Sequence, residues 1–222
     1  MYEHILFDLD GTLTDPYLGI TNSIIYSLKK LNIDPPENEA LIPFIGPPLQ
    51  ESYEIYYNLK DEKNLEAVRL YREYYSDKGM FENAVYPGIK LLLDALKSMD
   101  KKLYVATSKP THFARPILEH FHLDHYFESI TGSELDGTRT NKSEVIQHVL
   151  DTHRLPKSSC IMIGDRKYDI IGAQKNNIDS IGVLYGYGDI NEIKQAQPTY
   201  TIATIDYLLD AITNDTNYFD YI

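Results

Sequence analysis

The stretch 4–14, HILFDLDGTLT, constrains the fold of this chain more than any other part of the sequence. Its apolar run at 5–7 is too short for a helix, and an Asp-Gly pair soon after it marks a turn. This combination is typical of a buried parallel strand that ends in a turn. The strand would deliver Asp8 and Asp10 to its carboxyl end, which is where open α/β sheets place their ligands.

Asp8 and Asp10 occupy alternate positions at the end of this strand, so their side chains should point to the same side. Two such carboxylates repel each other unless a cation neutralises them or one of them stays protonated. The pair therefore predicts either a bound metal or two carboxylates with different duties. Taken alone, the pair is more typical of a strand end with a solvated turn, but three further segments favour a phosphoryl-transfer site.

Four motifs carry a resemblance to a known family. FDLDGTLT at 7–14 resembles the first motif of the haloacid dehalogenase superfamily, DxDGT after a hydrophobic strand. VATSK at 105–109 is similar to the second motif, Lys142 to the third and IMIGDRKYD at 161–169 to the fourth, all in the family's order. The segment GVLYGYGD at 182–189 is similar to phosphoglycolate phosphatase-like and 5'-nucleotidase-like members.

Length and composition limit the alternatives. A chain of 222 residues with 43% hydrophobic content suits one large or two modest domains with real cores. A net charge of −12 argues against nucleic acid as a partner. The N-terminus shows no leader pattern and no run of ~18 apolar residues occurs, so we expect a cytoplasmic protein that does not bind membranes. The single cysteine, Cys160, is expected to pack in the core, and the sequence does not separate a monomer from a homodimer.

The pattern of secondary structure changes along the chain. Between 17 and 83 only helices are predicted, at 17–31, 37–42, 49–58 and 62–78. From 85 onward strands alternate with helices: the strands are expected at 103–106, 126–131, 159–163 and 180–184, and the helices at 89–99, 110–120, 142–153, 168–176 and 204–212, ahead of a loose tail. This change predicts an α/β domain that contains an all-helical insert.

We therefore predict an α/β catalytic core at 1–15 and 84–222 and a helical cap domain at 16–83. The resemblance implies that the core is a doubly wound, Rossmann-like parallel sheet with the strand order 3-2-1-4-5.

The resemblance also implies a role for each motif residue. Asp8 would attack phosphorus and form an aspartyl phosphate, while Asp10 would protonate the leaving oxygen and later take a proton from water. Thr107 and the amide of Ser108 would bind phosphate oxygens, and Lys142 would offset the charge of the phosphate and Asp8. Without the motifs, Thr107 would be an ordinary helix cap and Lys142 a solvated lysine.

A magnesium ion is the implied cofactor. By resemblance, its ligands are Asp8, the backbone carbonyl of Asp10 and Asp165. Hard oxygen ligands together with a phosphate favour Mg²⁺ over zinc, and the sequence has no His/Cys cluster. Asp169, four residues after Asp165, is expected to act through water or by holding Lys142. The alternative for Asp169 is an acid that only favours a helix N-terminus.

The second acid of the first motif points to phosphate esters. We expect a Mg²⁺-dependent phosphomonoester hydrolase that acts on a small phosphorylated metabolite, either phosphoglycolate or a nucleoside 5'-monophosphate. A phosphomutase of a sugar phosphate with the same aspartyl-phosphate chemistry is the alternative. A non-catalytic binding module is a third interpretation, although such a module would be expected to have lost one of the motif residues.

One loop of the insert is a candidate for substrate selection. The segment 44–48 cannot continue a helix and is stiffened by two prolines. A cap inserted after the nucleophile strand can hinge over the site, so the loop is predicted to face the phosphate pocket and contact the leaving group. A plain helix–helix connection is the alternative. The loop consists of Phe44, Ile45, Gly46, Pro47 and Pro48.

Overall fold

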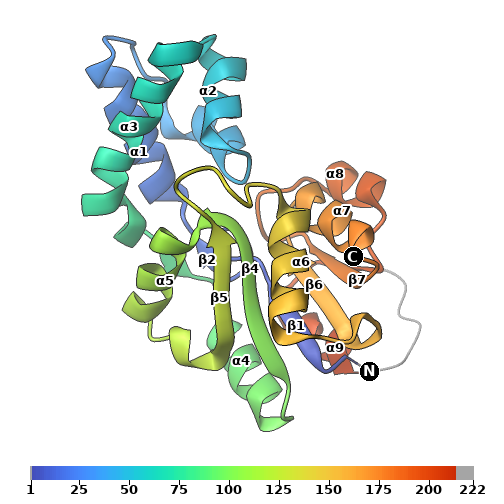
Figure 1. The fold of residues 1–222 in the computed structure, drawn as a ribbon. Helices are drawn as coiled ribbons and strands as arrows, with labels where there is room; N and C mark the ends of the chain where they lie inside the picture. Colours follow the sequence, from blue (N-terminus) through green and yellow to red (C-terminus); the bar gives the residue numbers. More distant parts are fainter. Residues whose placement is uncertain (1, 214–222) are drawn as a thin grey trace. The chain divides into compact units, whose positions relative to one another are not determined.

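Strand β1 (His4–Phe7) lies between β4 (Lys102–Pro110) and β6 (Cys160–Gly164) in a parallel sheet of six strands (Figure 1). The computed structural model describes residues 2–213. The sheet has the order β5-β4-β1-β6-β7-β8, in which β5 is Phe127–Ser133, β7 is Asp179–Val183 and β8 is Tyr200–Ile202. The predicted doubly wound α/β sheet with the order 3-2-1-4-5 is confirmed, and β8 adds an edge strand that the sequence did not predict.

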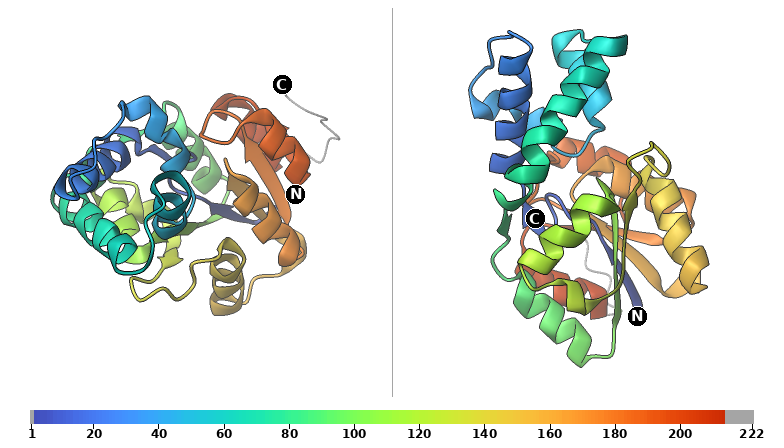
Figure 2. Two further views of the ribbon diagram at one scale, coloured as in Figure 1. Left: turned by 90° about the horizontal axis from the view of Figure 1, so that it is seen from above. Right: turned by 60° about the vertical axis from the view of Figure 1, so that its left-hand side comes forward.

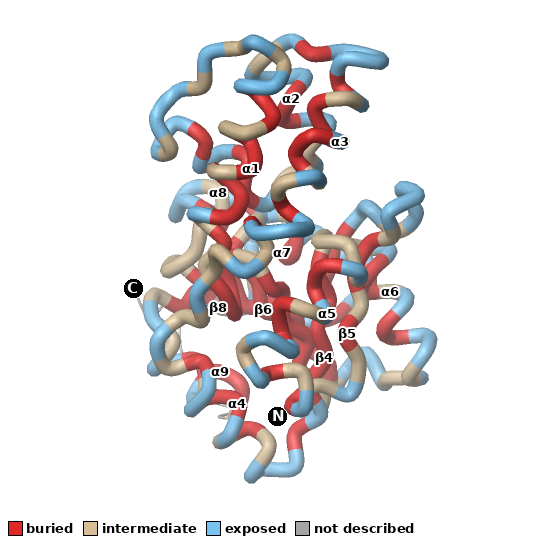
Figure 3. The backbone as a smooth tube through the Cα atoms, turned by 90° about the vertical axis from the view of Figure 1, so that its left-hand side faces the viewer, coloured by how far each residue is buried: buried red, intermediate tan, exposed pale blue. Residues whose placement is uncertain are grey.

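The central strands are apolar because both of their faces are covered. All three apolar residues of β1 are fully buried. On one face of the sheet, Leu6 and Met162 pack in a cluster with residues of α6 (Lys142–His153) and α7 (Lys167–Lys175). Cys160 is fully buried in this cluster. Figure 2 shows helices on both sides of the sheet, and Figure 3 shows β4 and β6 among the buried parts of the chain.

The other helices of this part of the chain follow the strands in sequence. They are α4 (Ile89–Ser98), α5 (Thr111–His120), α8 (Ile190–Ala196) and α9 (Leu208–Thr213). The predicted helix at 204–212 begins instead as a 3-10 turn, Ile205–Tyr207, before α9. The predicted loose tail falls mainly on 214–222, outside the described residues. Neither α8 nor β8 was predicted, because both are short and too few residues repeat for a period to show.

The chain divides into two units, one formed by 1–14 with 85–222 and the other by 15–84. The second unit contains α1 (Tyr17–Lys30), α2 (Leu49–Tyr57) and α3 (Asp61–Asp77). On α1, Ile20, Ile24 and Leu28 are buried at the four-residue spacing that predicted an amphipathic helix. A hydrogen bond of 2.8 Å from Ser27 Oγ to the carbonyl oxygen of Ala67 joins α1 to α3.

One helix of this second unit differs from the prediction. The segment expected to end before Pro43 is a 3-10 helix, Asn38–Phe44, that runs through the proline. The hydrogen bond from Ile45 N–H to Ile42 O, 2.9 Å long, spans Pro43 without using an N–H from it. Pro43 is therefore tolerated, because this turn does not need the donor that proline lacks.

Two short strands, β2 (Thr14–Asp15) and β3 (Ala84–Val85), pair with each other where the chain passes between the units. They had not been predicted, since two residues cannot show alternation. Across residues 2–213, every helix is too short or too polar to cross a lipid bilayer.

Candidate active site

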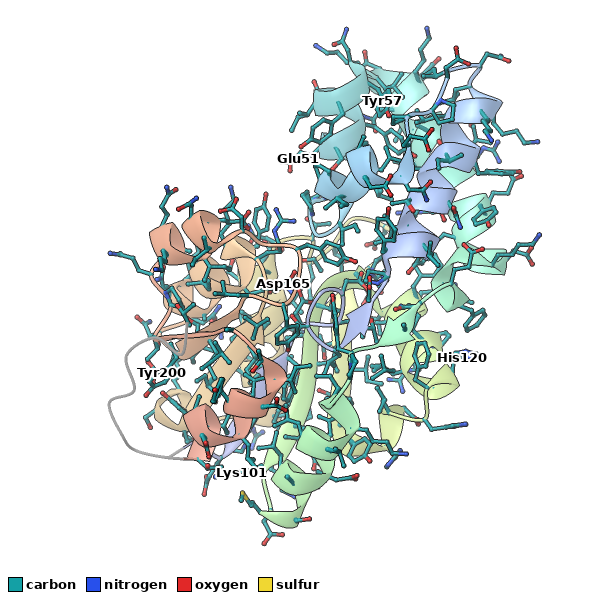
Figure 4. The ribbon with its side chains drawn as sticks, turned by 180° about the vertical axis from the view of Figure 1, so that it is seen from behind. Glu51, Tyr57, Lys101, His120, Asp165 and Tyr200 are labelled. Carbon is teal, nitrogen blue, oxygen red and sulfur yellow. The ribbon has the colours of Figure 1, made fainter. Side chains whose placement is uncertain are left out.

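The carboxyl ends of β1, β4 and β6 bring the predicted residues together. Asp8 directly follows β1, Asp165 directly follows β6, and Thr107 lies in the last part of β4. The strands are in register, with Phe7 opposite both Val105 and Ile163, so the residues that follow meet at one edge of the sheet. Figure 4 labels Asp165 at this edge and Lys101, just before β4, at the opposite edge.

Lys142 makes three polar contacts at this edge. It is the first residue of α6, a helix capped by the Asn141 side chain, which accepts a hydrogen bond from Ser143 N–H. Lys142 Nζ lies 2.8 Å from Asp8 Oδ1 and 2.8 Å from Asp169 Oδ1, and it donates to the Ala106 carbonyl oxygen at 3.1 Å. These acceptors match the three donors of an ammonium group.

The charge of Lys142 is maintained by these contacts. Burial alone would lower the pKa of the ammonium, but the carboxylates of Asp169 and Asp8 raise the pKa of Lys142 to about 12. Lys142 is therefore a buried, permanently charged group between two acids.

Three buried aspartates form an acidic cluster. Asp8, Asp165 and Asp169 each offer a carboxylate oxygen, and these atoms lie within 4.8 Å of one another. Burial, and then the neighbouring Asp169 and Asp8, raise the pKa of Asp165 to about 8. Burial also raises the pKa of Asp169, against the opposing effect of Lys142. One lysine does not balance three carboxylates, so a hard divalent cation fits this oxygen donor set.

Hydrogen bonds from neighbouring groups orient the carboxylates of Asp165 and Asp169. Asp165 Oδ2 accepts a hydrogen bond of 2.8 Å from Tyr187 N–H, and Oδ1 accepts one of 3.3 Å from the Thr12 hydroxyl. Asp169 Oδ2 accepts a hydrogen bond of 3.0 Å from Arg166 N–H at the start of α7. Asp169 thus bonds to its own helix terminus, pairs with Lys142 and belongs to the acidic cluster.

Asp10 has different surroundings from Asp8. Its carboxylate forms an ion pair with Lys109, and it is not a member of the acidic cluster. Burial raises the pKa of Asp10, while Lys109 acts in the opposite direction. The turn after Asp10 needs a glycine, because Gly11 has φ +78° and a Cβ there would lie 2.1 Å from Asp165 Oδ2.

The phosphate-binding candidates lie where β4 becomes irregular. The register between β4 and β5 shifts between Ala106 and Pro110. Such shifts re-aim residues beside active sites. Thr107 is buried and its hydroxyl accepts a hydrogen bond of 3.2 Å from Lys109 N–H, whereas the Ser108 carbonyl accepts one of 2.8 Å from the Ser133 hydroxyl.

Comparison with known proteins decides the family. The family of haloacid dehalogenase-like hydrolases matches residues 5–183 of the chain. The chain belongs to this family. It is 49% identical over 204 residues to a 5'-nucleotidase of Pseudomonas aeruginosa, covering 92% of each protein. It is 37% identical over 210 residues to the tyrosine-protein kinase PtkA of Mycobacterium tuberculosis, covering 94% of this chain and 72% of that protein.

A solved structure agrees with this assignment. The crystal structure of a predicted phosphatase from Clostridium acetobutylicum matches with a TM-score of 0.92 and 48% identity, covering 96% of this chain and 98% of that one. The predicted family resemblance is confirmed, and so is the predicted enzyme class, a phosphatase of the haloacid dehalogenase type.

Sequence reasoning overlooked three residues that contact the motif aspartates of this haloacid dehalogenase-like enzyme. They are Thr12 and Tyr187, which bond to Asp165, and Lys109, which pairs with Asp10. Each lies inside a segment that carried the family resemblance, so its position in the sequence could have indicated that it lies near the site. None of the three is an acid, so none has the residue type that makes the motif aspartates conspicuous.

The segment 182–189 also packs against the site. A Cβ on Gly186 would lie 2.3 Å from the Gly11 carbonyl oxygen and 2.4 Å from Asp165 Cβ. The Tyr185 hydroxyl donates a hydrogen bond of 3.0 Å to the Thr12 carbonyl oxygen. This segment therefore supports both the turn after β1 and the acid after β6.

The loop 44–48 belongs to the helical unit. The Phe44 ring packs against the rings of Tyr53, Tyr56 and Tyr57 on α2, with centroids 5.3 to 6.0 Å apart. Phe44 and Ile45 are buried, Pro47 is partly exposed, and Gly46 and Pro48 are exposed. The predicted role of this loop in substrate selection stays a prediction.

Proposed function

We propose that this protein is a Mg²⁺-dependent phosphatase of nucleoside 5'-monophosphates that works through an aspartyl phosphate on Asp8. The observation that carries the proposal is the separation of the two motif aspartates. Asp8 pairs with Lys142 beside Asp165, whereas Asp10 pairs with Lys109. Two carboxylates with different partners can serve as a nucleophile and as an acid. The relative named 5'-nucleotidase supports the substrate class.

Asp8 would begin the reaction. Its Oδ1 is engaged by Leu9 N–H at 2.7 Å and by Lys142, so we assign the attack on phosphorus to Oδ2. The new bond from Asp8 to phosphorus forms as the bond from phosphorus to the ester oxygen breaks. Thr107 and the Ser108 amide would orient the phosphate oxygens during this step.

Asp10 would transfer the protons. It enters the reaction protonated, gives this proton to the departing ester oxygen, which leaves as the nucleoside hydroxyl, and becomes a carboxylate. It then takes a proton from the water that attacks the aspartyl phosphate. This second displacement releases inorganic phosphate, regenerates the Asp8 carboxylate and returns Asp10 to its protonated form.

The metal would be held by Asp8 and Asp165, with the Asp10 backbone carbonyl as the third ligand implied by the family motif. The buried acidic cluster, with one lysine for three carboxylates, is the reason a cation fits there. When bound, Mg²⁺ supplies positive charge that neutralises phosphate oxygens. Asp169 would then hold Lys142 in place.

A substrate panel tests the proposal. Phosphate release is measured with nucleoside 5'-monophosphates, phosphoglycolate and hexose phosphates, each with and without Mg²⁺. We expect the highest kcat/KM with a nucleoside 5'-monophosphate and no release without metal. Faster release from phosphoglycolate would contradict the substrate class, and accumulation of a hexose phosphate isomer would indicate a phosphomutase.

Transfer of phosphate to protein tyrosine is a second candidate, because one relative is named a tyrosine-protein kinase. Incubation with ATP and a tyrosine-containing peptide separates the two. We expect no phosphotyrosine, since water accepts the phosphoryl group in the proposed reaction.

A further inference from the structure

The ion pair with Lys109 distinguishes Asp10 from Asp8, but the reaction steps described above give Lys109 itself no task. The two side chains are 6% and 14% exposed, so this is a buried pair. It joins the last part of β4 to the turn after β1, within the same unit. Removing two charged groups from water costs free energy. A buried ion pair offsets this cost only when the two groups lie within hydrogen-bond distance, and the two side chains then hold each other in one geometry.

The two oxygens of the Asp10 carboxylate are not equivalent. Lys109 binds Oδ2, whereas Oδ1 has no hydrogen-bond partner among the described residues. An oxygen that is fixed in direction but unbonded is suited to exchange a proton with a substrate. The contact with Lys109 therefore selects which oxygen of Asp10 is available.

Asp10, held by Lys109, is not a member of the acidic cluster. Asp8, only two residues before Asp10, belongs to that cluster. A carboxylate that rotated freely at position 10 could approach the cluster and act as an additional metal ligand. In addition, Lys109 N–H bonds to the Thr107 hydroxyl, so a single residue touches both the acid and a phosphate-binding candidate.

We propose that Lys109 is the positioning residue for Asp10: it holds Oδ2 so that Oδ1 meets the oxygen of the leaving group. This inference rests on the proposed function, because it assumes that Asp10 transfers a proton to that oxygen. Lys109 acts through Asp10 and does not contact the substrate.

The dependence of the rate on the leaving group tests this role. Lys109→Met is compared with wild type on a nucleoside 5'-monophosphate, whose leaving oxygen needs a proton, and on para-nitrophenyl phosphate, whose leaving group does not. We expect kcat to fall about 100-fold on the nucleotide and less than about 5-fold on the aryl ester, with KM for both nearly unchanged. Lys109→Arg, which keeps the charge, should recover most of the nucleotide rate.

Two further variants distinguish a positioning role of Lys109 from a general effect of its replacement on the structure. Lys97→Met removes a lysine of the same unit from a half-exposed pair with Glu128 and should leave both rates unchanged. The double variant Lys109→Met with Asp10→Asn should be no slower than Asp10→Asn alone, because both changes remove one function. If Lys109→Met does not fold, as judged by circular dichroism, Lys109→Gln replaces it.

Several outcomes would overturn the inference. An equal loss on both substrates, or a loss confined to KM, would mean that Lys109 contacts the substrate. A further loss in the double variant would mean that Lys109 acts independently of Asp10. If Asp10→Asn itself slows both substrates equally, the proton-transfer role of Asp10 fails and this inference fails with it. If wild type hydrolyses neither substrate, the proposed function fails first.

Discussion

Lys142 Nζ and Asp8 Oδ1 lie 2.8 Å apart, in side chains that are 3% and 12% exposed. The contact joins the first residue of α6 to the residue that follows β1. Because the lysine also binds Asp169, removing either charge alters a network of three buried groups. Lys142 keeps Asp169 as a partner when Asp8 is neutralised, whereas replacing Lys142 leaves both acids without their shared cation.

Asp8→Asn should abolish turnover and preserve the fold. The amide is nearly isosteric with the carboxylate, but it neither attacks phosphorus nor neutralises a metal. We expect less than about a thousandth of the wild-type kcat, the order expected when a covalent nucleophile is lost. Asp151→Asn, on the exposed side of α6, is the control. Activity of Asp8→Asn above that level, with a normal circular dichroism spectrum, would rule out Asp8 as the nucleophile.

Lys142→Met should lower stability as well as activity. The change leaves Asp8 and Asp169 buried without their shared cation. Breaking a buried pair on one side costs about 3–5 kcal/mol. Urea denaturation in the presence of EDTA measures the change in the free energy of unfolding. Lys97→Met, which breaks a half-exposed pair, should change it by less than about 1 kcal/mol. Equal stability of the two variants would contradict the structural role of Lys142.

Removal of metal should stop the reaction. We expect EDTA to abolish phosphate release, Mg²⁺ to restore it and Ca²⁺ to inhibit, since Ca²⁺ prefers more ligands at longer distances and would disturb the approach of Asp8 to phosphorus. Phosphate release is followed with each ion added back to chelated protein. Undiminished activity in excess chelator would exclude Asp165 from a metal-binding role.

The strength of each sequence signal explains how much of the fold could be predicted. The continuous apolar run at 5–7 identified β1 because the strand is covered on both faces. The four-residue spacing of Ile20, Ile24 and Leu28 identified α1. By contrast, β8 has only three residues, so no period could indicate it. Pro43 predicts the end of an α-helix, but the 3-10 helix found there runs through the proline.

The residues of the candidate site also differ in how strongly the local sequence indicates them. Asp8 and Asp165 are predicted site residues because acids after short apolar strands are conspicuous. The partner of Asp10 was not found, because nothing local in the sequence relates Lys109 to a residue 99 positions away. That relation depends on the pairing of β1 with β4, which becomes visible only when the strands are placed side by side.

Gly186→Ala should weaken metal binding. Its Cβ would lie 2.4 Å from Asp165 Cβ, so the Asp165 carboxylate must shift. Changes beside a metal ligand typically cost 10- to 100-fold in affinity, and we expect a loss of about tenfold in Mg²⁺ affinity by calorimetry.

Gly182→Ala is the matched control for this change, because its Cβ would meet Ile193 Cγ2 at 2.6 Å and not Asp165. It should lower the melting temperature without changing Mg²⁺ affinity. If both alanine variants bind Mg²⁺ as wild type does, the segment 182–189 does not position Asp165.

We propose that the loop 44–48 selects among substrates through its leaving-group contacts. Pro47 is the sharper target, because it is partly exposed whereas Ile45 is buried and its replacement also affects packing. Pro47→Ala should change kcat/KM for nucleoside 5'-monophosphates relative to phosphoglycolate by about tenfold, the size of one apolar contact. It should leave hydrolysis of para-nitrophenyl phosphate within about twofold, because the small aryl ester makes few contacts beyond its phosphate.

Ile45→Val tests the same loop with a smaller change in volume and should move selectivity in the same direction by less. Ile55→Val, at an exposed position on α2 of the same unit, is the control and should leave the ratio between substrates unchanged. If nucleotide, phosphoglycolate and aryl substrates all slow by one factor in Pro47→Ala, the loop is a plain connection. The loop would then make no contact specific to the leaving group, because such a contact cannot affect all three esters equally.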